Sequence, residues 1–131
     1  RSDLSLSGST SLGPTFDYVE GWYEGSAERM GRALHPNLAK RIVSKTPKTR
    51  KDRLDEMIAK GLVRYTQRGG GTKTPRKRQQ KDVTIFDIYN DEASAKLTFL
   101  KWVGFLHLAR FNGRWVIVNV LWQYKRKPSP G

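Results

Sequence analysis

The sequence predicts an α+β domain in which three N-terminal helices cover one face of a curved antiparallel sheet. Three runs in the second half of the chain are rich in β-branched and aromatic residues, which favour strands: Val83–Tyr89, Ala93–Phe111 and Arg114–Trp122. Asn112-Gly113 separates the last two runs and is a strong hairpin signal. Apolar residues in the first half recur at helical spacing instead. We therefore expect helices packed across a bent sheet, with a cone-shaped cavity between the two layers.

The first two helices are predicted from capping residues and from one apolar stripe. Pro14 is tolerated in the first turn of a helix, and Gly25 is typical of the residue that follows a helix end. Ser26 then occupies an N-cap position, and Pro36 stops the second helix because the residue before a proline disfavours the α region. The stripe of the first helix consists of Tyr18, Val19, Trp22 and Tyr23.

The middle of the chain is less regular. Residues 38–43 form a short strand or an irregular segment, and residues 44–49 form a polar loop. Asp52 suits the N-cap of a third helix. The apolar stripe of that helix would contain Leu54, Met57, Ile58 and Leu62. Residues 68–80 are rich in glycine and then in basic residues, and they lack the spacing of a phosphate-binding loop, so we expect a flexible connector.

The length and composition favour one domain without structural disulfides. Of the 131 residues, we assign 14–127 to the domain, 1–13 to a disordered tail or a cloning remnant, and 128–131 to a second tail. The chain has no cysteine and only two histidines, so we expect no metal and no cofactor. No apolar run reaches the roughly 18 residues of a membrane span, so we expect no membrane partner. The location is left open, with the cytoplasm favoured.

The chain is strongly basic, with a formal net charge of +13 and a pI near 10.3. Such a balance favours anionic partners, among them nucleic acid. Lysine and arginine are concentrated in residues 40–53, 73–81 and 125–127. Because the sequence has no zinc-finger spacing and no clear recognition helix, a solvated basic surface is the main interpretation. A nucleic-acid site stays open as the alternative.

Four segments carry a resemblance to a known family: 18–25 (YVEGWYEG), 33–38 (ALHPNL), 102–108 (WVGFLHL) and 113–122 (GRWVIVNVLW). From residue 15 to about residue 125 the chain resembles the lumazine-binding-like branch of the nuclear-transport-factor-2-like superfamily. The resemblance implies an α+β cone of cystatin-like architecture, a pocket between sheet and helices, and a homodimer packed through the sheet. Relatives include ketosteroid isomerases and non-catalytic binding proteins, so the fold leaves the function open.

One departure from the family pattern lies in the central strand. Gly104 and Phe105 stand where the pattern has Asp and Tyr, so the carboxylate and the phenol implied by the resemblance are absent. Glycine inside a strand often marks a bend or the close approach of another group.

Three residues are candidates for catalysis. Strict alternation along residues 93–111 places Lys101 and His107 on one face among apolar neighbours. A desolvated Lys101 would have a lowered pKa and act as an amine nucleophile, whereas at a bulge or an edge it would reach water. His107 is either a general acid or base, or a hydrogen-bonded residue of the core or a dimer interface. Asp87 lies between two apolar residues and, if buried, needs a polar partner.

These observations favour a small-molecule-binding domain with an apolar, aromatic pocket. The residues expected to line the pocket are Tyr18, Trp22, Phe99, Gly104, Phe105 and Trp122. The expected ligand is small and apolar or aromatic, because flat rings stack on aromatic side chains. The first alternative is an enzyme, which includes a reworked scaffold, using Lys101 or His107 on a carbonyl-type substrate. The second is a basic accessory module that binds nucleic acid.

Overall fold

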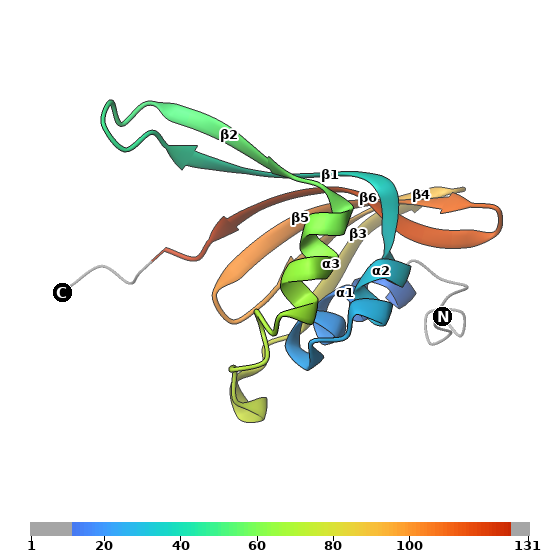
Figure 1. Ribbon diagram of the computed structural model, residues 1–131. Coiled ribbons are helices and arrows are strands. Elements are labelled where there is room, and N and C mark those ends of the chain that lie inside the picture. Colours follow the sequence, from blue (N-terminus) through green and yellow to red (C-terminus); the bar gives the residue numbers. More distant parts are fainter. Residues whose placement is uncertain (1–11, 127–131) are drawn as a thin grey trace.

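The computed structural model describes residues 12–126, and the predicted tails lie largely outside them. Three helices, α1 (Leu12–Glu24), α2 (Ala27–Ala33) and α3 (Ala59–Gln67), pack on one side of a six-stranded sheet (Figure 1). A short 3₁₀ turn, η2 (Arg76–Arg78), lies in the loop after α3. The strands are β1 (Leu34–Lys45), β2 (Asp52–Met57), β3 (Asp82–Tyr89), β4 (Glu92–Thr98), β5 (Trp102–Phe111) and β6 (Arg114–Tyr124). The predicted α+β class is confirmed.

The sheet has the order β2-β1-β6-β5-β4-β3 and is mixed. All neighbouring strands are antiparallel except β1 and β6, which run parallel, so the wholly antiparallel sheet of the prediction is wrong at this one pair. A parallel pair needs a long crossover, and here most of the chain lies between the two strands. In Figure 1 the β1–β2 hairpin extends past the ends of the other strands.

The run from Ala93 to Phe111 is two strands, not one. It turns back at residues 99–101, where the Phe99 N–H donates to the Trp102 carbonyl at 2.8 Å. The Tyr23 hydroxyl of α1 stabilises this turn, because it accepts from the Leu100 N–H at 3.0 Å and donates to the Gln80 carbonyl at 2.9 Å. A contact between residues 77 positions apart therefore helps to set a turn that lacks Gly, Pro, Asn and Asp.

The segment around Asp52 is a strand, not the start of a helix. Residues 52–57 pair with β1 in an antiparallel hairpin, from Lys40 opposite Met57 to Lys45 opposite Asp52. The strand interpretation of residues 38–43 is confirmed, and α3 begins only at Ala59. The stripe assigned to a third helix was ambiguous because its first apolar residues, Leu54 and Met57, also fit a strand on an exposed hairpin.

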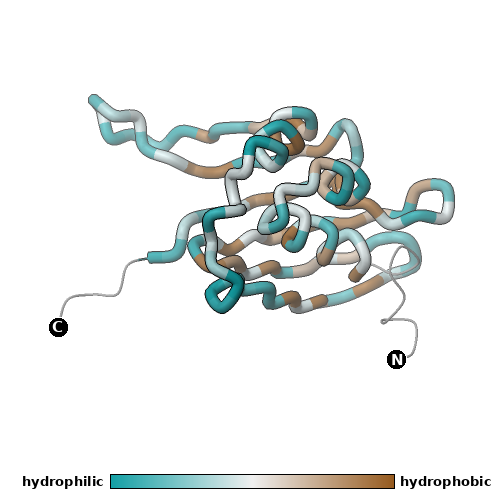
Figure 2. The backbone as a smooth tube through the Cα atoms, turned by 60° about the horizontal axis from the view of Figure 1, so that its bottom comes forward, coloured by the Kyte–Doolittle hydropathy of each residue, from teal (hydrophilic) through white to brown (hydrophobic). Residues whose placement is uncertain are grey.

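The core lies between the helices and the concave face of the sheet. Figure 2 shows hydrophobic segments along the strands and hydrophilic ones at the hairpin tips. Side chains with exposures of 4% or less come from both layers, and they include Tyr18, Val19, Met30, Leu97, Leu106, Leu108 and Ile117. Because side chains alternate along a strand, the residues between these buried ones, such as Phe105 and His107 on β5, point to the outer face of the sheet.

Ion pairs between α1 and α2 fix the two helices to each other. Asp17 receives hydrogen bonds from Arg29 at 3.0 Å and from Arg32 at 2.9 Å, and Glu20 accepts from Arg29 at 2.6 Å. Burial alone would raise the pKa of Asp17, but the hydrogen bonds from Arg32 and Arg29 outweigh burial and lower it. The α1 stripe is thus held in one orientation over the sheet.

Replacing the fully buried Leu97 by Ala should lower the free energy of unfolding by about 2–5 kcal/mol, because the substitution leaves a cavity in the core. Leu54→Ala is the matched control, since Leu54 is 58% exposed in β2, and it should cost less than about 1 kcal/mol. Urea denaturation of both variants measures the difference. Equal losses would contradict the placement of the core.

Candidate functional site

An aromatic cavity of about 300 Å³ lies between the helices and the sheet. We call it the aromatic cavity, and its lining residues are Tyr18, Trp22, Lys40, Met57, Leu62, Tyr65, Trp102, Trp122 and Tyr124. They come from α1, β1, β2, α3, β5 and β6. Six of the nine are aromatic, so the walls offer flat apolar surfaces with a few polar atoms, as is usual for small-ligand sites.

The aromatic walls support one another through edge-to-face contacts. Trp102 lies 5.5 Å from Trp22 and 5.7 Å from Trp122 between ring centroids, and Trp122 lies 5.0 Å from Tyr124. The strand register produces this cluster, because Trp102 pairs with Tyr124 and Gly104 pairs with Trp122. Edge-to-face contacts between aromatic rings contribute more stabilising free energy than the burial of their apolar surface alone, and they restrict the motion of the rings.

The glycine-rich loop packs against the back of this wall. A Cβ atom at Gly70 would lie 2.5 Å from the Trp22 ring, and one at Gly71 would lie equally close. Only glycine permits this approach of the backbone. The loop that we expected to be a flexible connector therefore has a packing role at Trp22.

Among residues 12–126, Lys40 is the only charged residue that lines the aromatic cavity. It points inward from β1 beside Val120 of β6, and it is only 6% exposed. Its Nζ donates a hydrogen bond to the Tyr18 hydroxyl and lies 5.0 Å from the Trp122 ring centroid and 5.1 Å from that of Tyr18. Within residues 12–126 it forms no ion pair with a carboxylate.

The environment of this pair changes the protonation of both groups. Burial lowers the pKa of Lys40 to about 7, because the ammonium loses its hydration without gaining a counter-ion. Burial also raises the pKa of Tyr18, so the phenol keeps its proton throughout the neutral range. Near pH 7 the cavity therefore holds an amine that is about half unprotonated beside a neutral phenol.

The structure brings together some of the predicted pocket residues and separates others. Tyr18, Trp22 and Trp122 line the aromatic cavity. Gly104 is buried next to it, with Trp122 Cβ 3.9 Å from where its own Cβ would be. Phe99 is buried behind the wall, 5.1 Å from Trp102 between ring centroids. Phe105 lies on the outer face of the sheet and is 48% exposed.

The predicted catalytic residues lie outside the aromatic cavity. Lys101 is exposed in the β4–β5 turn, at the rim of a smaller hollow of about 130 Å³, which agrees with the interpretation in which it reaches water and not with a desolvated lysine on a strand. The turn at residues 99–101 interrupts the alternation that would have placed it among apolar neighbours. Lys40 was missed, although Leu38, Lys40 and Ile42 alternate with other residues as on the inner face of a strand.

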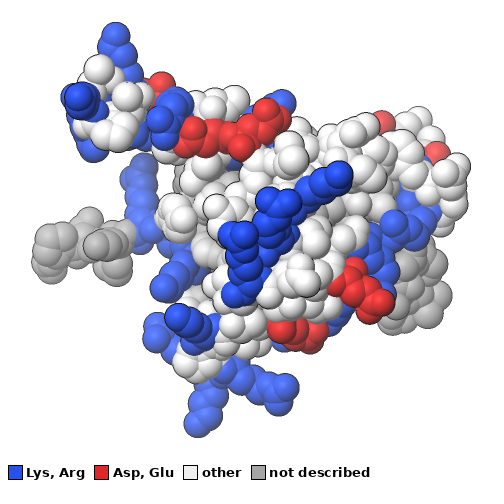
Figure 3. Space-filling model, viewed as in Figure 1, with Lys and Arg blue, Asp and Glu red and all other residues white. Residues whose placement is uncertain are grey.

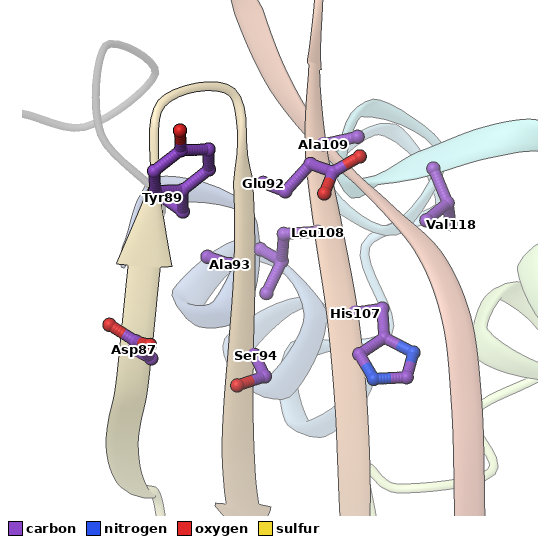
Figure 4. Close-up of a pocket in the computed structure, with 9 residues that line it drawn as sticks. All are labelled: Asp87, Tyr89, Glu92, Ala93, Ser94, His107, Leu108, Ala109 and Val118. Carbon is purple, nitrogen blue, oxygen red and sulfur yellow. The ribbon is translucent and has the colours of Figure 1, made fainter.

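Asp87 and His107 lie on the outer face in a second, shallow pocket of about 400 Å³, shown in Figure 4. The strand register places Asp87, Ser94 and His107 side by side on β3, β4 and β5. Asn119 Nδ2 lies 3.3 Å from His107 Nδ1. Ser94 stands between the acid and the imidazole, so the histidine is not placed between a hydroxyl and a carboxylate as a nucleophile-base-acid triad requires.

A cluster of metal-binding side chains and a membrane-spanning helix are both absent from the part of the chain that the structure describes. Residues 12–126 contain no cluster of three His, Asp or Glu side chains that could hold a metal ion. None of the helices over the same residues has the length and apolar character needed to cross a membrane.

Basic side chains gather over the β1–β2 hairpin tip, over α3 and over the loop that contains η2 (Figure 3). In the hairpin, part of the charge is neutralised by neighbouring acids through the ion pairs Arg41–Glu56, Lys45–Asp52 and Arg53–Asp55. Lys40 belongs to the same basic stretch but is buried. On the face shown, acidic side chains also interrupt the basic ones, as on a mixed surface.

Comparisons with known proteins agree with this architecture. A family model described as "Putative lumazine-binding" matches residues 10–123. A nuclear-transport-factor-2-like protein of unknown function from Silicibacter pomeroyi has a similar structure, with a TM-score of 0.64, 12% identity, and coverage of 87% of this chain and 92% of that one. A similar protein of unknown function from Shewanella baltica matches with a TM-score of 0.62 and 15% identity, over 88% of this chain and 91% of that one. A third, from Cytophaga hutchinsonii, matches with a TM-score of 0.56 and 11% identity, over 87% of this chain and 94% of that one. No curated protein matches the sequence.

The lowered pKa of Lys40 should make stability depend on pH. Between about pH 7 and the ordinary lysine value of 10.5 the unfolded chain holds this proton and the folded chain does not. Stability therefore rises with pH across that window, by up to about 3 kcal/mol between pH 7 and 9.5. Below pH 7 both states are protonated and the contribution of Lys40 becomes constant. Chemical denaturation at several pH values measures the slope.

Lys40→Met should remove most of that slope and raise stability at pH 6, because no ammonium is then buried. Lys45→Met is the matched control, as Lys45 lies on the same strand with a half-exposed side chain. It should leave the slope in place. A parent protein whose stability is flat from pH 7 to 9.5 would show that Lys40 is not desolvated. Measurements stay below pH 10, where Tyr18, with its raised pKa, would begin to act in the opposite direction.

Proposed function

The chain belongs to the lumazine-binding-like family of the nuclear-transport-factor-2-like superfamily, and we propose that it is a small-molecule-binding domain whose ligand occupies the aromatic cavity. The observation that carries the proposal is the cavity itself, with six aromatic side chains and one buried amine around about 300 Å³. A site of this kind suits a flat apolar or aromatic ligand with one polar group. The rings supply stacking and burial, and Lys40 with Tyr18 supplies a polar contact that fixes orientation.

The aromatic cavity is better suited to this role than the pocket on the outer face. The outer pocket is shallow, and several of its lining side chains, including Asp87, Tyr89 and His107, are exposed. A ligand there would stay largely in water, whereas tight small-molecule sites bury most of the ligand surface. Lys101 and His107 remain candidates for catalysis from the sequence, but neither lines the cavity that carries this proposal.

We propose a second copy of the chain as the partner of the outer face. Phe86, Phe105 and Leu121 lie on strands β3, β5 and β6 and are each about half exposed, at 55%, 48% and 47%. The Phe86 and Phe105 rings stack at 6.3 Å, and Leu121 is the cross-strand neighbour of Phe105. A group of exposed apolar side chains on one face of the sheet supports the proposal of an interaction surface there. The family resemblance, which implies dimers packed through the sheet, favours a like partner.

Filling the aromatic cavity should abolish binding. Met57→Trp places an indole in it, and the affinity for the neutral fluorescent probe N-phenyl-1-naphthylamine should fall at least about tenfold, since the apolar volume is lost. Leu54→Trp adds the same indole on the same strand outside the cavity and should leave affinity unchanged. Probe fluorescence titrations measure both. Equal affinity in the two variants would refute the cavity as the ligand site.

A charge on the outer face should separate the copies. Phe105→Asp should raise the dimer dissociation constant at least about tenfold, because a charged carboxylate would replace an apolar ring and lose its hydration at the interface. Ile58→Asp is the control, since Ile58 is 63% exposed at the start of α3 on the helical side of the domain. Sedimentation equilibrium reads the dissociation constants. A parent protein that stays monomeric at high concentration would count against the dimer.

A further inference from the structure

We propose that Lys40 is a covalent attachment point, at which its Nζ forms an imine with an aldehyde or ketone ligand held in the aromatic cavity. The inference rests on the proposed function and adds the chemical class of the ligand. It assigns a reactive role to the one charged side chain of the cavity.

The position of Nζ suits this role. Lys40 extends from β1, which pairs with β2 on one side and β6 on the other, so its backbone is held on both edges. The side chain is nearly buried, and its amine contacts the Tyr18 hydroxyl between the Tyr18 and Trp122 rings. No carboxylate of residues 12–126 forms an ion pair with it. The amine is therefore anchored and open to a ligand on the cavity side.

The protonation states favour nucleophilic attack at neutral pH. With a pKa of about 7 instead of 10.5, on the order of a thousand times more of this amine than of an ordinary lysine is unprotonated at pH 7. Burial keeps the Tyr18 phenol protonated, so its O–H can donate a hydrogen bond to a carbonyl oxygen beside Nζ. The two groups thus provide a nucleophile and a proton donor at adjacent positions.

The reaction balances without any other reagent. The Nζ lone pair forms a bond to the carbonyl carbon, the C=O π bond breaks, and one amine proton passes to the oxygen to give a carbinolamine. The carbinolamine then loses its hydroxyl group and the remaining amine proton as water, which leaves a C=N bond between ligand and Lys40. Nothing is oxidised or reduced. The water-poor aromatic walls favour the step that releases water and retain the apolar part of the ligand.

A carboxylate ligand paired with the Lys40 ammonium is the competing possibility. It would bring a second charge into a cavity that offers one amine and otherwise apolar or phenolic groups. Burying both charges costs desolvation energy that a single contact repays poorly. An aldehyde or ketone enters neutral and reacts with the unprotonated form of the amine, which the site already favours. The observations therefore support a carbonyl ligand over an anionic one.

The test uses the full chain with 6-methoxy-2-naphthaldehyde at pH 7.5, followed by borohydride reduction to fix any imine and by mass spectrometry with peptide mapping. We expect one adduct per chain, on Lys40, formed at least about thirty times faster than on Lys45 in the same molecule. The rate should rise with pH and reach half its maximum near pH 7. Lys40→Met should lose this adduct, and Lys45→Met should keep it.

Two unreactive analogues separate the possible failures. If 2-methoxynaphthalene binds but the aldehyde gives no preferred adduct on Lys40, the imine proposal is overturned and the binding function stands. Tighter binding of 2-naphthoate than of 2-methoxynaphthalene, without a Lys40 adduct, would identify Lys40 as an anion contact. That result would also overturn the imine proposal. If neither analogue nor aldehyde binds, both proposals fail. Because mapping is done on the parent protein, the result does not depend on how the variants fold.

Discussion

The hydrogen bonds of the Tyr23 hydroxyl hold together the parts on which the site depends. This one oxygen joins α1 to the β4–β5 turn and to the segment before β3. The turn decides which face each residue of β5 presents. With the chain reversed at residues 99–101, Gly104 and Leu106 face the helices, and Phe105 and His107 face away. The same contact sets α1 over the sheet, so that Tyr18 and Trp22 reach the cavity from the helical side.

The sequence was sufficient for the fold class and for the aromatic face of α1, because both follow from local periodicity and from the family resemblance. Tyr18, Trp22 and Trp122, which the sequence predicted as pocket residues, line the aromatic cavity, and their contact with a ligand stays a prediction. Lys101 was misplaced because its predicted face depended on an unbroken strand. The reversal there is stabilised by a contact with Tyr23, far away in the sequence, and local residues gave no signal for it.

Lys40 was overlooked for the opposite reason. It sits in a dense basic stretch whose other members mostly point into water, so charge clustering suggested a solvated surface. Only the pairing of β1 between β2 and β6 turns that one side chain inward. The two lysines illustrate a general point about buried charge. Whether a lysine on a strand loses its hydration depends on the face of the sheet to which its side chain points, and the register with the neighbouring strands fixes that face. Gly104 fits the same view, as it leaves room near Trp122 where the family pattern has a carboxylate.

The parallel pairing of β1 with β6 has a consequence for how the protein matures. Lys40 and Val120 are register partners, although 80 positions separate them. Contacts of such long range form late and slowly, since a large loop must close before they are gained. During synthesis the amine of Lys40 stays in water with ordinary basicity until β6 has emerged. Any chemistry that needs a desolvated amine at this position is therefore available only once the domain is complete.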